Sequence, residues 1–152
     1  KTILIELSVK YDFLIMEDRK FNDISYIVSM QYKRFYNWVD LVTCHSIVTD
    51  DVIKTLSGIM LVTDMSNNTY NFMESANELI TNNKNRLVGL ITQKEMHTDL
   101  IRMTPGISLD NSYNISDQKY RSKNNVNTDF YIIGRNIYNS ENPCETIKKF
   151  LK

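Results

Sequence analysis

The sequence predicts an α/β fold, a parallel sheet with helices packed outside it, formed by one domain over residues 1–152. Short and nearly continuous apolar runs alternate along the chain with longer segments in which apolar residues recur at helical spacing. Strands of this kind are buried on both faces, as in parallel sheets that crossover helices cover. A chain of 152 residues with 42% hydrophobic content is long enough for one core and too short for two ordinary domains.

The first 44 residues contain two predicted helix and strand pairs. Apolar residues three and four apart predict a helix over residues 1–10, and the apolar run at 13–16 predicts a buried strand. A second apolar face predicts a helix between residues 23 and 38, with Asp23 placed as its cap. The run at 41–44 then predicts the next strand.

The same alternation continues to the end of the chain. The remaining predicted elements are, in order, a helix at 50–56, a strand at 59–62, a helix at 72–81, strands at 87–91, 100–104 and 130–133, and a helix at 144–151. About six strands result, whereas a closed barrel of this type has eight and typically about 250 residues. An open doubly wound sheet is the alternative, but the chain has only four glycines and no Gly-rich dinucleotide turn.

Charge and composition limit the classes of partner. Eighteen basic side chains balance eighteen acidic ones, so no net field attracts nucleic acid or anionic lipid, and an anionic ligand must be held locally. No apolar run reaches the roughly 18 residues that cross a bilayer, and the start lacks signal-peptide sections. We therefore expect a cytoplasmic protein without nucleic-acid or membrane partners. Reduced Cys44 and Cys144 are favoured over a disulfide, which stays open.

Charged residues follow the first predicted strand. Asp18 and Lys20 are two positions apart, so the alternation of a regular strand would place both side chains on one face. A carboxylate and an ammonium would meet there, and Asp23 could add a second carboxylate. This constellation suits proton transfer. A solvated loop with surface ion pairs is the alternative for such a segment taken alone.

The run from Lys10 to Ile24 resembles the third strand of eukaryotic orotidine 5'-phosphate decarboxylases, whose pattern is Asp-x-Lys-x-x-Asp. Asp18, Lys20 and Asp23 match that pattern. Further matches, in order, are Gln31-Tyr32, Trp38-Val39-Asp40-Leu41, His45, Asp64-Met65-Ser66, Met103-Thr104-Pro105-Gly106-Ile107, Asp117-Gln118-Lys119-Tyr120-Arg121 and Ile132-Ile133-Gly134-Arg135. The resemblance implies a TIM (β/α)8-type barrel, incomplete because the first two strands are missing, and favours this fold over the open sheet.

The resemblance also implies a function. The family decarboxylates orotidine 5'-monophosphate to UMP in de novo pyrimidine biosynthesis, without a cofactor. Lys20 would protonate C6 of the pyrimidine while Asp18 and Asp23 hold it, and Asp23 would act in the other subunit of a homodimer. The implied substrate-binding residues are Ser66, Pro105, Gln118, Tyr120, Gly134 and Arg135. The later ones follow the last two barrel strands, where this fold usually binds phosphate.

Departures from the family pattern leave other functions open. Two strands expected before Lys1 would bring an aspartate and a lysine of the site, and Ile27 stands where the family has a substrate-binding threonine. The alternative is therefore a catalytically inactive, truncated or degenerate relative that binds phosphate or dimerises. A sugar-phosphate lyase sharing Asp-x-Lys-x-x-Asp is a third possibility, but it needs magnesium. No residues have metal-ligand spacing, so we predict no metal.

Overall fold

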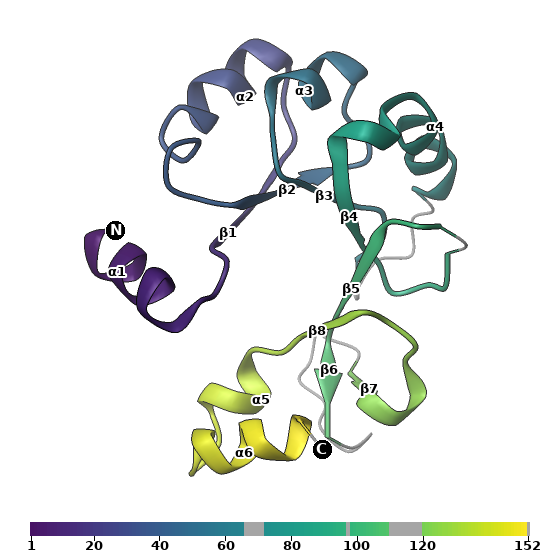
Figure 1. Cartoon of the computed structure of the whole chain (residues 1–152). Coiled ribbons are helices and arrows are strands. Elements are labelled where there is room, and N and C mark those ends of the chain that lie inside the picture. Colours follow the sequence, from purple (N-terminus) through teal and green to yellow (C-terminus); the bar gives the residue numbers. More distant parts are fainter. Residues whose placement is uncertain (66–71, 97, 110–119, 152) are drawn as a thin grey trace. The chain divides into compact units, whose positions relative to one another are not determined.

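The computed structural model describes residues 1–65, 72–96, 98–109 and 120–151. The chain forms two compact units, one of residues 1–63 and 72–90 and the other of residues 64–71 and 91–152 (Figure 1). Among the described residues, every helix is too short or too polar to cross a membrane. The assignment of all 152 residues to one domain stays a prediction.

The first unit alternates helices with parallel strands. Its elements are α1 (Thr2–Tyr11), β1 (Met16–Phe21), α2 (Ser25–Tyr32), β2 (Leu41–His45), α3 (Asp50–Thr55), β3 (Ile59–Val62), α4 (Met73–Asn83), η1 (Lys84–Arg86) and β4 (Leu87–Ile91), whose last residue falls in the second unit. The strands are ordered β1-β2-β3-β4, and β2 pairs in parallel with both β1 and β3. This is the predicted α/β arrangement.

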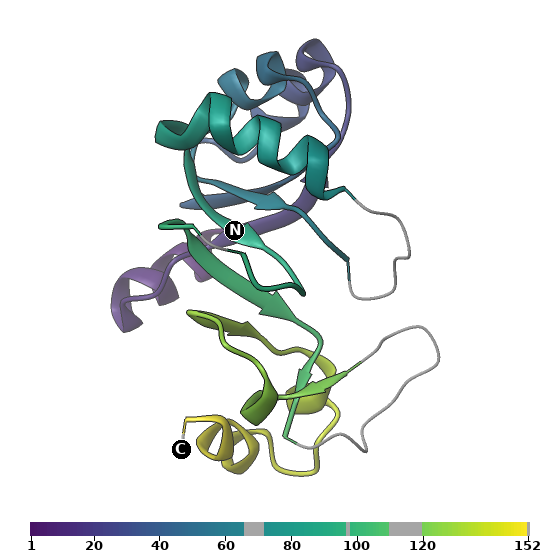
Figure 2. The ribbon, with the colours of Figure 1, turned by 90° about the vertical axis from the view of Figure 1, so that its right-hand side faces the viewer.

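The core of the first unit lies between these strands and the helices that follow them. All four residues of β3 are buried, as are Val42 and Cys44 of β2. The helices contribute Val28 from α2, Val52 and Ile53 from α3, and Ala76 and Leu79 from α4. Helices α2, α3 and α4 lie side by side along the strands (Figures 1 and 2). Their apolar stripes therefore face the sheet, as their sequence spacing predicts.

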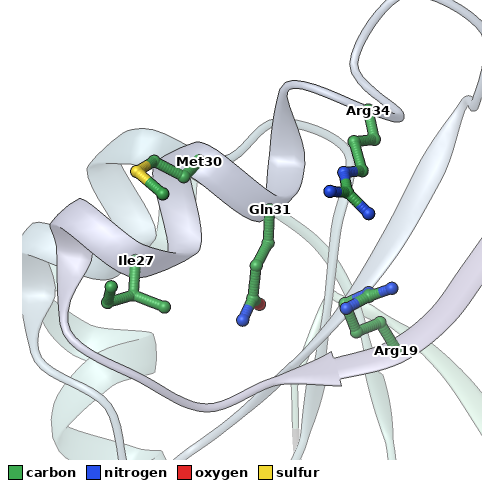
Figure 3. Close-up of a pocket in the computed structure, with 5 residues that line it drawn as sticks. All are labelled: Arg19, Ile27, Met30, Gln31 and Arg34. Atoms are coloured by element: carbon green, nitrogen blue, oxygen red, sulfur yellow. The ribbon is translucent and has the colours of Figure 1, made fainter.

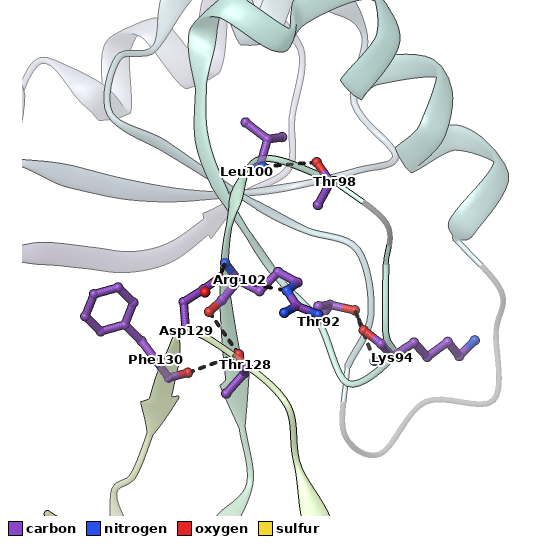
Figure 4. Close-up of polar contacts among 8 residues, drawn as sticks. All are labelled: Thr92, Lys94, Thr98, Leu100, Arg102, Thr128, Asp129 and Phe130. Carbon is purple, nitrogen blue, oxygen red and sulfur yellow. Dashed lines mark hydrogen bonds and ion pairs between the residues drawn. The ribbon is translucent and has the colours of Figure 1, made fainter.

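The second unit contains shorter elements. They are β5 (Ile101–Pro105), β6 (Ile107–Ser108), β7 (Arg121–Ser122), η2 (Lys123–Asn125), β8 (Phe130–Ile132), α5 (Arg135–Tyr138) and α6 (Pro143–Phe150). β5 pairs in parallel with β8, and β6 with β7. The Arg102 amide donates to Asp129 Oδ2 at 2.8 Å and the Thr128 hydroxyl donates to the Arg102 carbonyl at 2.9 Å (Figure 4). These bonds fix the segment before β8 beside β5.

Two local expectations are wrong. The first strand begins at Met16 rather than residue 13, because Asp12 ends α1 in the left-handed conformation with φ 54° and the chain then runs to Ile15 as a connector. The Ile15 amide donates to Asp40 Oδ2 at 2.7 Å in that connector. Asp23 does not cap α2, whose N-cap is Ile24; its carboxylate instead accepts from the Ile24 amide at 2.8 Å.

Candidate active site

The predicted ion pair forms at the end of β1. Lys20 Nζ donates to Asp18 Oδ2 at 2.7 Å, and the two side chains are 34% and 55% exposed. Both side chains are therefore accessible to a ligand while they contact each other. An ion pair this exposed contributes little to stability, so its proximity is of interest for chemistry rather than for folding.

The backbone that carries this pair is not a regular strand. Glu17 lies opposite Val42 and Phe21 opposite Cys44, so Asp18, Arg19 and Lys20 together face the single residue Thr43. Lys20 has φ 56°, in the left-handed region that side-chain-bearing residues seldom adopt. Bulges of this kind redirect side chains and are frequent beside active sites. The alternation expected from a regular strand therefore does not account for the meeting of Asp18 and Lys20.

Thr43 of β2 holds the bulge in place. Its side chain is completely buried, its Oγ1 accepts from the Lys20 amide at 2.8 Å, and its hydroxyl can donate to Asp18 Oδ1 at 3.1 Å. One hydroxyl thus contacts both members of the ion pair, through the backbone of one and the side chain of the other. Sequence reasoning missed this residue. The available signal is a hydroxyl inside an otherwise apolar strand, which needs a hydrogen-bond partner when buried.

His45 ends β2 close to the same cluster. Burial lowers the pKa of His45, and the positive charge of Lys20 lowers it further. The ring packs edge-on against Phe72, with 6.4 Å between ring centroids, and Nδ1 is buried without a hydrogen-bond partner among the described residues. The lowered pKa favours the neutral imidazole, which adds no second positive charge beside Lys20. Sequence matching identified His45 only as one of the residues shared with the family, with a core or lining role.

Asp23 lies apart from this pair within its own chain. Its side chain is exposed, and among the described residues it makes no ion pair or hydrogen bond with Asp18 or Lys20. It lines a hollow formed by the loops after β1 and β2, with Asn22, Ile24, Ser25, Ile47, Val48, Thr49 and Asp51. The first two residues of the Asp-x-Lys-x-x-Asp pattern are therefore brought together here and the third is not.

In the second unit, Tyr120 and Arg135 come together. The Arg135 guanidinium lies 5.9 Å from the centre of the Tyr120 ring, and Arg135 is the first residue of α5, with Gly134 as the N-cap. A cation over an aromatic face is held in direction by the ring. Pro105 ends β5, and its carbonyl accepts from Gln93 Nε2 at 2.5 Å. Ser66 and Gln118 lie outside the described residues.

Arg121, beside Tyr120, has a different role. Its guanidinium donates to the carbonyls of Gln93 at 2.5 Å and Asn125 at 3.2 Å. These bonds connect η2 to the segment after β4. The Arg121 side chain therefore stabilises the backbone of the second unit. Within the described ranges, no group of three or more His, Cys, Asp or Glu residues is placed to hold a metal ion.

Comparison with known proteins points to one family. The family model "Orotidine 5'-phosphate decarboxylase / HUMPS family" matches residues 2–150. The chain is 30% identical to the orotidine 5'-phosphate decarboxylase of Pichia kudriavzevii, covering 97% of this chain and 67% of that protein. It is 31% identical to the enzyme of Pachysolen tannophilus, with coverage of 89% and 60%, and 30% identical to the uridine 5'-monophosphate synthase of Bos taurus, with coverage of 98% and 36%. It thus spans about two thirds or less of these relatives.

Solved structures show the same fold. Orotidine 5'-monophosphate decarboxylase from Methanocaldococcus jannaschii, complexed with the inhibitor BMP, superposes with a TM-score of 0.72 at 21% identity over 98% of this chain and 77% of that one. The Thermotoga maritima enzyme gives 0.69 at 20% identity, over 99% and 80%. The predicted TIM-type barrel, of which this chain holds part, is confirmed. From the family match over residues 2–150, the chain belongs to the orotidine 5'-phosphate decarboxylase family.

Proposed function

We propose that this chain carries the catalytic lysine of an orotidine 5'-phosphate decarboxylase, which converts orotidine 5'-monophosphate to UMP and carbon dioxide. The observation that carries the proposal is the contact of 2.7 Å between Lys20 Nζ and Asp18 Oδ2 at the end of β1. Family membership supports the reaction class. The roles given to individual residues rest on the geometry of the pair together with the resemblance of the motif.

In the proposed reaction, the bond between C6 and the substrate carboxylate breaks and its electron pair remains at C6. Lys20 Nζ donates a proton to C6 and later regains one from water, so the reaction consumes one proton per UMP. Asp18 directs the amine through the hydrogen bond of 2.7 Å from Lys20 Nζ to Asp18 Oδ2. Its negative charge also disfavours the substrate carboxylate in the ground state more than the departing neutral carbon dioxide. No cofactor is required.

The phosphate of the substrate is assigned to the second unit. Arg135 is suited to it, since a guanidinium forms bidentate, charge-assisted bonds with phosphate. Tyr120 supports this assignment by holding the guanidinium direction, and the Gly134 and Arg135 amides are further donors. Pro105, Gln118 and the pyrimidine contact Ser66 are carried over from the resemblance alone. Binding energy from this remote group would be used in the transition state at C6.

Asp23 is proposed to act in the partner subunit of a homodimer. Its exposed carboxylate accepts only the neighbouring Ile24 amide among the described residues, which leaves acceptor positions for a lysine of a second copy. This would explain why Asp23 does not join Asp18 and Lys20 in its own chain. The expected cytoplasmic location stays a prediction.

The second candidate function is a catalytically inactive relative that binds phosphate or dimerises. One observation favours it: Ile27 lacks the hydroxyl of the family's threonine. Phosphate binding is compatible with both functions, so binding alone does not separate them. Turnover does.

The decisive experiment follows the pyrimidine absorbance when the purified chain is mixed with orotidine 5'-monophosphate. We expect turnover that Lys20→Ala reduces by at least about 100-fold, because a positioned acid contributes roughly 10²- to 10⁴-fold. Lys148→Ala is the matched control, since Lys148 forms an equally short ion pair with Glu145, at 2.7 Å, on the surface of α6. A folded dimer without turnover supports the inactive relative. Loss of turnover with a chelator contradicts both functions.

The role of Asp23 has its own test. Lys20→Ala and Asp23→Asn are each inactive under the proposal, but a mixed dimer has one intact site, formed by Lys20 of one subunit and Asp23 of the other. Random subunit exchange should restore about a quarter of the wild-type activity, since half of the dimers are mixed and each has one working site. Activity that stays at the level of the single variants would place Asp23 in its own subunit's site or outside both.

A further inference from the structure

A second polar hollow lies between β1 and α2 in the first unit. It is lined by Arg19 of β1, by Ile27, Met30 and Gln31 of α2, and by Arg34 just after that helix, and its volume is about 240 Å³. Figure 3 shows the two guanidinium groups near one another, with the Gln31 amide between them and the two apolar side chains. We propose that this hollow, whose lining residues do not include Tyr120 or Arg135, binds a small phosphate ester.

The charge of the hollow favours an anion. Both of its charged lining residues are arginines, and no lining residue is acidic. Glu17 offsets part of this charge, since its Oε1 lies 3.8 Å from Arg19 Nε, which leaves one net positive charge on Glu17, Arg19 and Arg34 together. Planar guanidinium groups match the oxygens of a phosphate, and the Gln31 amide beside them can donate to a third oxygen.

Arg19 is held in place before any ligand binds. Its guanidinium lies 5.2 Å from the centre of the Phe35 ring, and Glu17 holds its Nε side. The bulge of β1 sets its direction, because the Lys20 amide and Asp18 Oδ1 contact Thr43 whereas Arg19 lines the hollow with residues of α2. A donor fixed in this way loses less conformational freedom when it binds an anion.

Arg34 has a fixed backbone and an available side chain. Its amide donates to the Gln31 carbonyl at 3.3 Å, and its carbonyl accepts from Trp38 Nε1 at 2.8 Å. Its guanidinium, in contrast, makes no hydrogen bond or ion pair within the part of the chain that the structure describes. Two guanidiniums near one another repel, and a bound dianion would relieve that repulsion.

The apolar wall indicates that the ligand is an ester rather than a bare phosphate. Ile27 and Met30 are three residues apart on α2 and therefore lie on the same face of the helix. The volume lies below the roughly 300 Å³ at which pockets for drug-sized ligands begin. A phosphate with a short organic group would place its charge between the arginines and its carbon atoms against this wall.

The test uses the full chain with Arg135→Gln, so that the other phosphate contacts are weakened, and nitrogen-15 NMR of the arginine and glutamine side chains. Phosphate should shift the Arg34 and Gln31 signals more than chloride at equal ionic strength, and glycerol phosphate should bind more tightly than phosphate. Arg34→Gln should weaken binding about tenfold, because it removes a charge-assisted hydrogen bond. Lys33→Gln, which removes a neighbouring charge outside the hollow, should leave affinity within about twofold.

Dispersed spectra of both variants will show that they remain folded. Equal shifts by phosphate and chloride would overturn the site, as would equal losses of affinity in Arg34→Gln and Lys33→Gln. Glycerol phosphate that binds no more tightly than phosphate would overturn the assignment to an ester. None of these outcomes depends on turnover, so they are independent of the proposed decarboxylation.

Discussion

Thr43→Val tests whether one buried hydroxyl holds the bulge that carries Lys20. Valine keeps the shape of threonine but leaves the part-buried Lys20 amide without the acceptor that Thr43 Oγ1 provides at 2.8 Å. A buried donor without a partner costs about 1–3 kcal/mol. Loss of the bond to Asp18 adds little, because that side chain is 55% exposed and water can replace the hydroxyl. We expect the free energy of unfolding to fall by about 1–3 kcal/mol.

Urea denaturation measures the loss, and amide hydrogen exchange at Lys20 shows where it arises. The Lys20 amide should exchange faster in Thr43→Val by more than the change in global stability explains. Thr43→Ser is the matched control: it loses a buried methyl but keeps the hydroxyl, so that amide should stay protected. The reasoning is refuted if the Lys20 amide is equally protected in Thr43→Val and wild type, or if serine loses protection as valine does.

Three other outcomes follow from the same geometry. Gly58→Ala should lower the free energy of unfolding by more than about 2 kcal/mol in a urea titration, because φ is 65° and the added Cβ would clash with the Asp40 carbonyl oxygen. Gly134→Ala should lower it less, because its Cβ would meet no atom nearer than 3.6 Å. Burial raises the pKa of the Cys44 thiol from 9.0 to about 12. The contribution of the protonated thiol to the free energy of unfolding is therefore full below pH 9.0 and is lost as the pH rises towards 12. Cys44→Ala should lose less stability at alkaline pH than wild type, as measured by urea titrations at several pH values. Lys20→Met should raise the pKa of His45 part of the way to its ordinary value in an NMR titration, because burial, the larger cause, remains; an unchanged pKa would contradict the assigned effect of Lys20.

How far the fold follows from sequence depends on the element. β3 and β4 match the predicted strands residue for residue, because each is a short apolar run that ends at a threonine. The start of β1 was predicted wrongly since an apolar run also occurs in the connector, where only Ile15 is buried. β6, β7 and α5 were missed. Segments of two to four residues carry no period that separates them from a loop.

The candidate site was likewise only partly predictable from the sequence. Asp18 and Lys20 were identified from motif spacing, and the contact between them forms. Their backbone conformation was not predictable from that spacing, because a bulge depends on the partner strand as much as on its own residues. Thr43 and His45 lie in that partner strand. A single sequence gives no signal for which residue of one strand faces which residue of the next.

The irregular end of β1 therefore has to be explained by what offsets its cost. The left-handed conformation of Lys20 costs about 1–2 kcal/mol in a residue with a side chain. The bond from the Lys20 amide to Thr43 contributes about 1 kcal/mol, and burial of Phe21 just after the bulge, at 1% exposure, contributes about 2 kcal/mol more. The bulge is thus stable because a buried hydroxyl and a buried ring lie on either side of it. A relative with the Asp-x-Lys spacing but without a hydroxyl opposite the bulge should hold its lysine less firmly, whatever the rest of its motif.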